Sequence, residues 1–211
     1  MKEIFEHIVR HKIWDKKSTC GPGSTIGYTQ NIREKLKPLL IKHNIKSMFD
    51  APCGDYSWMS MINVQEVVNY SGGDIVEFMI EDNKKNYPTV NFKVFDLTVD
   101  SIPDVDLLFC RDLLLHLSFS DIDQVFSNIS RSNVKFILTS NWFEDATNTR
   151  DIKTGGWRYL NFLESPYNFG SPIDSIIDFV DGYPTREMFL WPKDVIDTYI
   201  KNISHGTHNV V

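Results

Sequence analysis

The feature that most constrains this chain is the alternation of short apolar segments with segments of helical spacing between residues 45 and 140. The strand-like segments are 47–51, 67–72, 90–95, 105–110 and 134–140, and the last two are rich in apolar residues. Segments 55–63, 78–87 and 121–130 lie between them and have helical spacing. This alternation predicts βαβ units, and hence a parallel sheet covered by helices on both faces.

The pattern changes after Ser140. Residues 141–171 contain Asn, Asp, Gly, Pro and many aromatic residues. They are too long for an ordinary connection, so we expect an insertion or lid. Segments 175–180 and 187–191 flank Asp-Gly-Tyr-Pro, which predicts a hairpin, and a last helix is expected from Pro192. The fold class is therefore α/β, with a Rossmann-like, seven-stranded, mostly parallel sheet, helices on both faces and a C-terminal antiparallel hairpin.

The N-terminal region predicts a cap on this sheet. Residues 28–44 have helical spacing, and Pro38 predicts a kink or a restart there. The glycine-rich stretch 20–27 does not fit a nucleotide loop, because no strand precedes it and its third glycine comes one residue late. We expect this glycine-rich stretch to be a loop leading into the helix. Residues 1–45 would then supply cap helices to a single domain spanning 1–211.

Composition excludes several classes of function. The chain of 211 residues has a formal net charge of −6, whereas a nucleic-acid-binding protein normally has a basic face. The three cysteines are far apart and form no CxxC pair, which favours a reducing cytoplasm over a zinc site. Neither a signal peptide nor a membrane-spanning segment is evident. We expect a cytoplasmic protein, monomeric or homodimeric, with no nucleic-acid or membrane partner and no metal.

The stretch FDAPCGDYSW at 49–58 marks the end of the first strand. Asp50 ends the strand, Pro52-Cys53-Gly54 form the turn, and Asp55 follows at once. Gly54 allows the backbone to approach a ligand closely. A pyrophosphate site uses several glycines and a free helix N-terminus, whereas two carboxylates favour a ligand with a positive group. Asp50 is otherwise a plain turn acid, and Asp55 otherwise only caps a helix.

Acidic residues also end the next two strands. Asp74 lies 24 residues after Asp50, close to the spacing at which nucleotide folds place an acid on ribose hydroxyls. Asp96 ends the third strand and is suited to accept a hydrogen bond from an adenine amine, although a strand-ending acid is often simply exposed. One ligand combines a cation, a ribose and an adenine. The three strand ends therefore indicate S-adenosylmethionine as the cofactor.

Over residues 20–192 the chain resembles the class I S-adenosylmethionine-dependent methyltransferases. The resemblance is carried by DAPCGD after strand one, the acids after strands two and three, FCRDLLLHLS after strand four and the terminal hairpin. Pro52-Cys53 replaces part of the commoner GxGxG pattern. The resemblance implies that the cofactor is bound by Asp50, Ala51, Pro52, Cys53, Gly54, Asp55, Trp58, Asp74, Ile75, Asp96, Leu97, Cys110 and Arg111.

Three stretches, APCGDYSWM, CRDLLLHLS and TGGWRYLNF, resemble more narrowly a bacterial subgroup found among surface-polysaccharide genes. This implies an O-methyltransferase acting on a small sugar-derived acceptor, such as a capsule heptose or a nucleotide-activated sugar. Methylation of an amine or a phosphoramidate, and a non-catalytic cofactor-binding partner, remain alternatives. A sugar-nucleotide oxidoreductase is disfavoured, because neither GxGxxG after the first strand nor a Tyr-xxx-Lys pair is present.

The segment after the fourth strand supplies the candidate catalytic residues, Asp112 and His116. Transfer of a methyl group to a hydroxyl requires a proton acceptor, and histidine has a suitable pKa. If the chain turns helical at once, the two residues share a face and Asp112 can orient His116. Asp112 is the alternative base, and a structural hydrogen bond is the alternative role for His116. The candidate acceptor-binding residues are Tyr28, Asn141, Trp157, Arg158, Asn161 and Asn168, and the insertion that holds most of them is otherwise a loop packed by its own aromatics.

Overall fold

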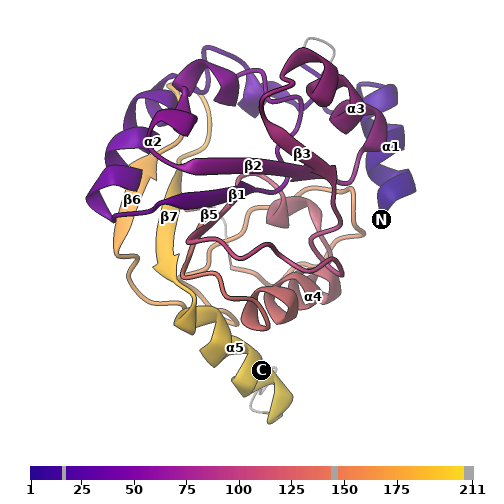
Figure 1. Cartoon of the computed structure of the whole chain (residues 1–211). Helices are drawn as coiled ribbons and strands as arrows, with labels where there is room; N and C mark the ends of the chain where they lie inside the picture. The colour runs from indigo at the N-terminus through magenta and orange to yellow at the C-terminus, as the bar shows by residue number, and fades with distance from the viewer. Residues whose placement is uncertain (16–17, 144–146, 207–211) are drawn as a thin grey trace.

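The computed structural model describes residues 1–15, 18–143 and 147–206 (Figure 1). Seven strands form one sheet in the order β3-β2-β1-β4-β5-β7-β6. The strands are β1 Ser47–Asp50, β2 Asn69–Asp74, β3 Asn91–Val94, β4 Leu107–Cys110, β5 Phe136–Trp142, β6 Asp174–Ile177 and β7 Arg186–Pro192. The predicted α/β fold with its mostly parallel sheet is confirmed.

The pairing of the strands determines where a ligand-binding crevice can form. β1 pairs in parallel with β2 and β4, while β7 runs antiparallel to β5 and β6. The strand order reverses between β1 and β4, so the connections after these two strands diverge. In open α/β sheets a crevice forms at such a point, beyond the carboxyl ends of the strands. Asp50 and Cys110, the last residues of β1 and β4, are at this edge.

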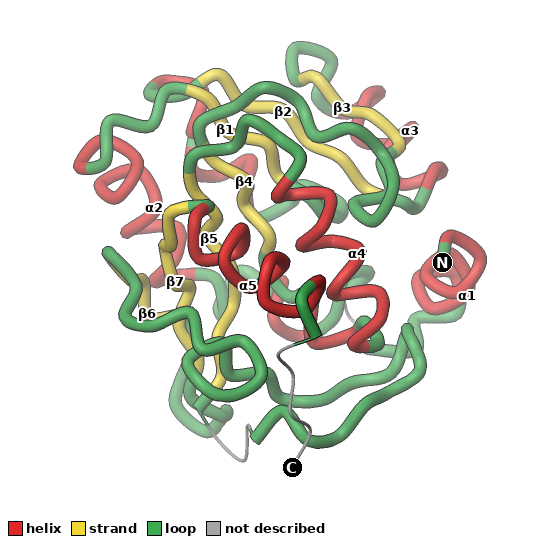
Figure 2. Tube along the Cα trace, turned by 90° about the horizontal axis from the view of Figure 1, so that it is seen from below, coloured by secondary structure: helices red, strands yellow, loops and turns green. Residues whose placement is uncertain are grey.

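In the described residues five α-helices flank the sheet, namely α1 Lys2–Arg10, α2 Gln30–Lys42, α3 Glu77–Asn86, α4 Phe119–Ser130 and α5 Asp194–Ser204. α2 contacts β6 and α3 contacts β3, while α4 and α5 pack on each other (Figure 2). α4 begins at Ser118, whose hydroxyl accepts from the Asp121 amide. None of the helices in the described ranges is long and apolar enough to cross a bilayer.

The start of the chain forms a helix and then the glycine-rich loop. Phe5, Ile8 and Val9 give α1 a buried apolar stripe, and the stretch 20–27 forms the short 3₁₀ turn η1 Pro22–Ser24 before α2 begins. The helix α2 runs through Pro38 without a restart. It packs against the sheet through Ile32, Leu36, Leu39 and Leu40, and this burial offsets the loss of one backbone hydrogen bond.

The α-helix expected at 55–63 is absent. This segment contains only the 3₁₀ turn η2 Met59–Ile62, and a second 3₁₀ turn, η3 Val64–Glu66, follows it. Tyr56 and Asn63 have left-handed φ values of 58° and 52°, which interrupt a right-handed helix at both ends. The Asp55 carboxylate accepts from the Ser57 amide and hydroxyl, so the side chain stabilises a turn.

The sheet is buried on both faces. Along β1, Met48 and Phe49 belong to two different hydrophobic clusters, one on each face. β4 alternates in the same way, and all four of its residues are buried. Burial on both sides is why the middle of β1 and all of β4 are apolar.

Candidate active site

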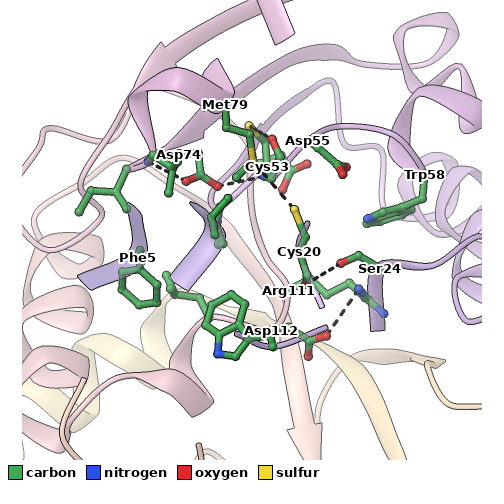
Figure 3. Close-up of a pocket in the computed structure, with 18 of the residues that line it drawn as sticks. Phe5, Cys20, Ser24, Cys53, Asp55, Trp58, Asp74, Met79, Arg111 and Asp112 are labelled. Carbon is green, nitrogen blue, oxygen red and sulfur yellow. Dashed lines mark hydrogen bonds and ion pairs between the residues drawn. The ribbon is translucent and has the colours of Figure 1, made fainter. Parts of the chain in front are cut away.

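Three adjoining cavities lie at the carboxyl edge of the sheet. The corner cavity surrounds the turn after β1 and is lined by Asp50, Pro52, Cys53, Gly54, Asp55, Trp58, Asp74 and Ile75, together with N-terminal residues (Figure 3). The side pocket continues it past Ala51, Pro52, Ile75, Asp96 and Leu97. The aromatic cavity, of about 460 Å³, lies toward the C-terminal hairpin. Trp14, Cys20 and Asp112 line both the corner cavity and the aromatic cavity.

The corner depends on Gly54. Its φ of 56° lies in the left-handed region, and a Cβ there would meet the Cys20 sulfur at 2.8 Å. The Gly54 amide donates to Asp74 Oδ2 at 3.0 Å, and the Val76 amide donates to Asp74 Oδ1 at 2.9 Å. The ends of β1 and β2 are therefore joined through one carboxylate.

The carboxylate of Asp50 is buried at the cavity wall. Tyr70 donates its hydroxyl proton to Asp50 Oδ2 at 2.8 Å. Asp50 Oδ1 is buried and has no hydrogen-bond partner in the described part of the chain. Burial raises the pKa of Asp50 to about 8, against the opposing effect of Tyr70. A cationic group in the cavity would satisfy this oxygen and favour the charged carboxylate.

Asp74 and Asp96 lie farther along the same wall. Burial raises the pKa of Asp74 to about 6, while the amides of Val76 and Gly54 hold it down. Asp96 is half-buried in the side pocket, and its Oδ1 accepts from the amide and hydroxyl of Thr98. The acids that end three strands thus line one connected hollow.

Two further candidate cofactor residues, Cys110 and Arg111, do not offer a free side chain to the cavity. Cys110 is fully buried in the core, and its carbonyl accepts from Thr139 Oγ1, so its side chain is behind the cavity wall. Arg111 lines the corner cavity, but its guanidinium is paired with Asp178 at 2.8 and 3.1 Å. Arg111 therefore reaches the cavity as part of a charge network.

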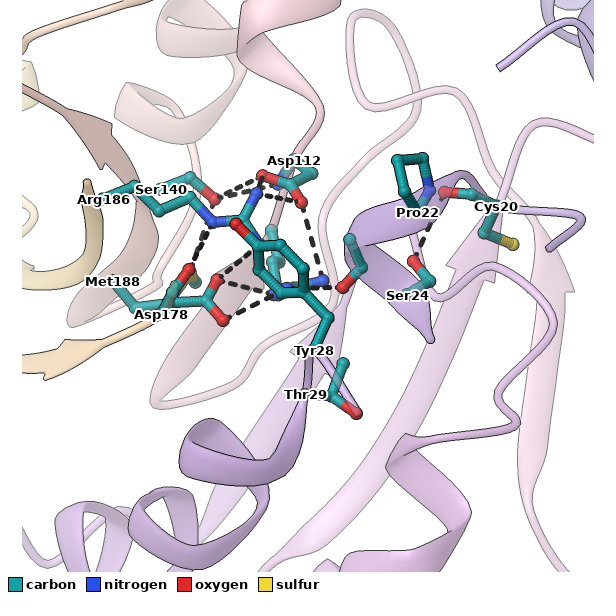
Figure 4. A network of polar contacts seen from close by, with 12 residues as sticks. Cys20, Pro22, Ser24, Tyr28, Thr29, Asp112, Ser140, Asp178, Arg186 and Met188 are labelled. Carbon is teal, nitrogen blue, oxygen red and sulfur yellow. Dashed lines mark hydrogen bonds and ion pairs between the residues drawn. The ribbon is translucent and has the colours of Figure 1, made fainter. Parts of the chain in front are cut away.

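That network, the charged quartet, consists of Arg111, Asp112, Asp178 and Arg186 (Figure 4). Arg186 Nη1 lies 2.5 Å from both oxygens of Asp112, and Arg186 Nη2 lies 3.0 Å from Asp178 Oδ2. Two positive and two negative charges cancel, which makes their burial tolerable. The quartet joins the end of β4 to the hairpin.

Asp112 occupies the junction between the corner and aromatic cavities. Its φ of 55° is unusual for a non-glycine residue and is held by contacts with Ser140 and Arg186. Burial acts to raise the pKa of Asp112, but the charges of Arg186 and Arg111 outweigh it and hold the pKa below its ordinary value. Asp112 is thus a fixed anion and a poor proton acceptor.

His116 lies in the turn η4 Leu114–His116 and lines the aromatic cavity. Its Nδ1 lies 2.7 Å from the Gly156 carbonyl oxygen, which only accepts, so Nδ1 carries the proton and Nε2 is left as the basic nitrogen. The expectation that Asp112 orients His116 is therefore wrong, because Arg186 takes that carboxylate and Gly156 holds the ring. Burial lowers the pKa of His116, although Gly156 and Asp112 oppose this.

The candidate acceptor residues separate into two groups. Tyr28 and Trp157 line the aromatic cavity. Asn141 and Asn161 are buried and bond to each other at 3.2 Å, and the Phe162 amide donates to Asn141 Oδ1 at 2.7 Å. They hold the insertion against β5, which corrects the expectation that they reach a ligand.

Arg158 and Asn168 are also outside the aromatic cavity. Arg158 donates to the Leu117 carbonyl at 2.6 Å, and its guanidinium lies over the Phe119 ring. Asn168 is exposed in a turn, with a φ of 48°. Both residues stabilise the loop rather than the cavity.

Several residues that line the cavities were not predicted from the sequence. Phe5, Val9, Trp14, Cys20, Ser24 and Met79 line the corner cavity, and Trp142, Tyr159, Tyr183 and Arg186 line the aromatic cavity. The apolar spacing of Phe5, Ile8 and Val9 was a usable signal for a buried helix. No local pattern marks Arg186, because its partners lie 74 and 8 residues away in the chain.

Solved structures with a similar fold are methyltransferases. The magnesium protoporphyrin IX methyltransferase of Synechocystis PCC 6803 with bound SAM is 14% identical, with a TM-score of 0.59, covering 88% of this chain and 96% of that chain. The methyltransferase domain of bacterial CtHen1 is 11% identical, with a TM-score of 0.59, and the match covers 78% of this chain and 99% of that domain. TehB of Haemophilus influenzae is 11% identical, with a TM-score of 0.54, and the match covers 74% of this chain and 60% of TehB. The chain has the class I methyltransferase fold.

Sequence comparison adds nothing to this likeness, since no protein-family model and no curated protein matches the chain. The strand order and the antiparallel β7 belong to the shared fold. The porphyrin in the name of the Synechocystis enzyme is the acceptor of that protein. The acceptor of the present chain has to be argued from its own cavity.

Proposed function

We propose that this protein is an S-adenosylmethionine-dependent methyltransferase. The observation that carries the proposal is the buried, unpartnered Oδ1 of Asp50 at the topological switch point. An unpaired carboxylate oxygen in a cavity wall is suited to bind a cationic group of a ligand. S-adenosylmethionine has two such groups, an ammonium and a sulfonium. The fold supports the same cofactor, because a solved neighbour contains it.

The residues of the hollow fit the parts of this molecule. Asp50 would hold the ammonium group, and Asp74 would accept from the ribose hydroxyls while keeping its two amide bonds. Ile75 and Leu97 provide apolar walls in the side pocket for the adenine, with Asp96 at its edge. Gly54 supplies close backbone approach, and Trp58 closes the wall near Arg111.

When bound, the cofactor supplies an electrophilic methyl group on sulfur. The chain's own task is to hold an acceptor hydroxyl in the aromatic cavity and to remove its proton. His116 is suited to this removal, because its Nε2 is unprotonated and a lowered pKa keeps the imidazole neutral near pH 7. Asp112, permanently ionised at the junction, is suited to accept a hydrogen bond from the acceptor and thereby orient it.

The aromatic cavity favours an uncharged ring as the part of the acceptor that it holds. Its wall contains the aromatic side chains of Trp14, Tyr28, Trp142, Trp157, Tyr159 and Tyr183. The charges in the wall, Asp112 and Arg186, are paired with each other. Aromatic faces pack well against flat or C–H-rich rings that have hydroxyl groups at their edges. These properties support the sugar-derived acceptor that the sequence resemblance implies, with O-methylation as the reaction.

The narrower identity of the acceptor rests on the resemblance. We propose a capsule heptose or a nucleotide-activated sugar, with an amine or phosphoramidate as the second candidate. The protein would work in the cytoplasm, where its three free thiols remain reduced. It would need no metal, and the described residues contain no cluster of potential ligands.

Calorimetry with S-adenosylmethionine, S-adenosylhomocysteine and NAD tests the cofactor. We expect the first two to bind and NAD not to bind. Transfer of labelled methyl to a panel of sugars, sugar nucleotides and amines, with and without a chelator, tests the acceptor. Binding of NAD alone would overturn the assignment, and cofactor binding with no transfer to any hydroxyl or amine would favour the non-catalytic alternative.

A further inference from the structure

Trp14 occupies an unusual position between the two large cavities. It follows α1 and lines both the corner cavity and the aromatic cavity. Its ring stacks on the imidazole of His116 with centroids 4.3 Å apart and an interplanar angle of 22°. Its other neighbour is Phe5, in an edge contact at 6.0 Å, and Phe5 also lines the corner cavity. One side chain thus touches the proposed cofactor wall and the proposed base.

Two contacts of different geometry fix His116. The hydrogen bond to the Gly156 carbonyl acts in the plane of the ring, and Trp14 covers one face of the ring. Together they remove rotation about both side-chain torsions and leave Nε2 as the available nitrogen. A hydrogen bond alone would still allow the ring to tilt.

The helix α1, which precedes Trp14, packs against the same turn that binds His116. Gly155 packs under α1 so closely that a Cβ there would lie 2.6 Å from Ile4 Cγ2. The Gly155 amide donates to the His116 carbonyl at 2.8 Å. At the start of α1, Lys2 pairs with Glu77 of α3 at 2.6 Å. The helix that precedes Trp14 is therefore held both by the turn that binds His116 and by α3.

We propose that Trp14 is a positioning residue for methyl transfer, which closes the cofactor cavity and holds the His116 imidazole against the acceptor cavity. The inference deepens the proposed function and rests on it. Trp14 does not exchange protons or bonds with the acceptor. Its contribution is to place Nε2 and to exclude water from the junction, where Asp112 is already fixed by Arg186.

The covered face also affects the charge of His116. Burial disfavours the imidazolium and is the largest influence on its pKa. Of the charged groups that act on it, Asp112 after β4 favours the imidazolium, and Arg158 of the insertion opposes it. Removal of Trp14 would admit water to the ring face while leaving both charges and Gly156 in place.

The test compares Trp14→Ala, Trp14→Leu and Trp14→Phe with the wild type in the full chain. Proton NMR titration follows the His116 ring signal, assigned by its absence in His116→Gln, and calorimetry gives the affinity for S-adenosylhomocysteine. In Trp14→Ala we expect the His116 pKa to rise toward its ordinary value of about 6.5. The affinity should fall about tenfold through the lost wall. Trp14→Phe should retain most of both properties.

Trp14→Leu separates ring stacking from bulk. Its bulk should largely keep the affinity, whereas its smaller, non-planar side chain cannot cover the imidazole face that Trp14 stacks on, so water reaches that face and the His116 pKa still rises. This variant decides the matter if the alanine variant fails to fold. Tyr183→Ala is the matched control, because Tyr183 lines only the aromatic cavity. It should leave the His116 pKa and the affinity unchanged.

An unchanged His116 pKa in folded Trp14→Ala and Trp14→Leu would overturn the positioning role. The proposed function and the role of Trp14 can be refuted separately. If the wild type does not bind S-adenosylhomocysteine, the proposed function is wrong, whereas a lost pKa difference with intact binding removes only the role of Trp14.

Discussion

At the scale of single residues, the proposed site depends on one acid whose environment is incomplete. Asp50 is buried with one satisfied oxygen and a pKa raised to about 8. In an unfolded chain the same carboxyl would titrate near ~4. The folded state therefore binds more protons between these values, and stability falls as pH rises from ~4 to about 8.

We expect Asp50→Asn to be more stable than the wild type at pH 8, because a neutral amide can still accept from Tyr70 without the cost of a buried charge. The same variant should lose affinity for S-adenosylhomocysteine, since the ammonium group loses its partner. Thermal unfolding at pH 5 and pH 8, together with calorimetry, measures both. Asp55→Asn is the stability control, because Asp55 is half-buried and bonded to Ser57. Equal stability of wild type and Asp50→Asn at pH 8 would contradict the account.

His116 gives the second prediction for a single residue. His116→Gln keeps a polar side chain of similar size but cannot act as a base, so turnover should fall about 10²–10⁴-fold. The affinity for the cofactor product should be nearly unchanged. Because burial lowers the pKa of His116, the wild-type rate should decline only below ~6.5, as the imidazole becomes protonated. Labelled-methyl kinetics from pH 5 to 8 would refute the role if His116→Gln kept normal turnover.

At the scale of elements, the charged quartet ties the hairpin to β4. Asp178→Asn removes one charge from between two buried arginines, whose side chains are 3% exposed. Loss of a buried partner costs about 3–5 kcal/mol. We expect the free energy of unfolding in urea to fall by an amount in that range.

The same hairpin provides the comparison. Lys42→Met breaks the pair between Lys42 and Asp174 of β6, in which the lysine side chain is 65% exposed. Exposed pairs are worth ~0–1 kcal/mol. Similar losses in the two variants would mean that the quartet does not hold the hairpin.

At the scale of the whole molecule, the N-terminal region of the chain covers the proposed cofactor site. α1 and the segment 18–24 bring Phe5, Val9, Cys20 and Ser24 to the corner cavity, opposite acids from β1 and β2 (Figure 3). Arg111 donates to the Gly23 carbonyl at 2.8 Å, so this segment also touches the charged quartet. A ligand in the cavity would therefore contact the N-terminal region and the sheet together.

We expect S-adenosylhomocysteine to raise the unfolding temperature and to slow amide hydrogen exchange in α1 and residues 18–24, because a ligand bound to both sides opposes local opening. Exchange followed by mass spectrometry measures this effect. α5, which packs on α4, should show no local change. Protection confined to the turn after β1 would show that the N-terminal segment does not close on the ligand.

The sequence by itself determined the sheet and the acids along its edge. Strand periodicity and the acids that end the strands, Asp50, Asp74 and Asp96, can be read from local sequence. Parallel strands bring their carboxyl ends to the same edge of a sheet regardless of how the loops fold. Only the tertiary structure decided which side chains complete the cavities. Trp14 on His116 and Arg186 on Asp112 are contacts between residues 102 and 74 positions apart. The charge state of each acid also depended on folding, because burial and neighbouring charges set a pKa, and neither can be read from residue order.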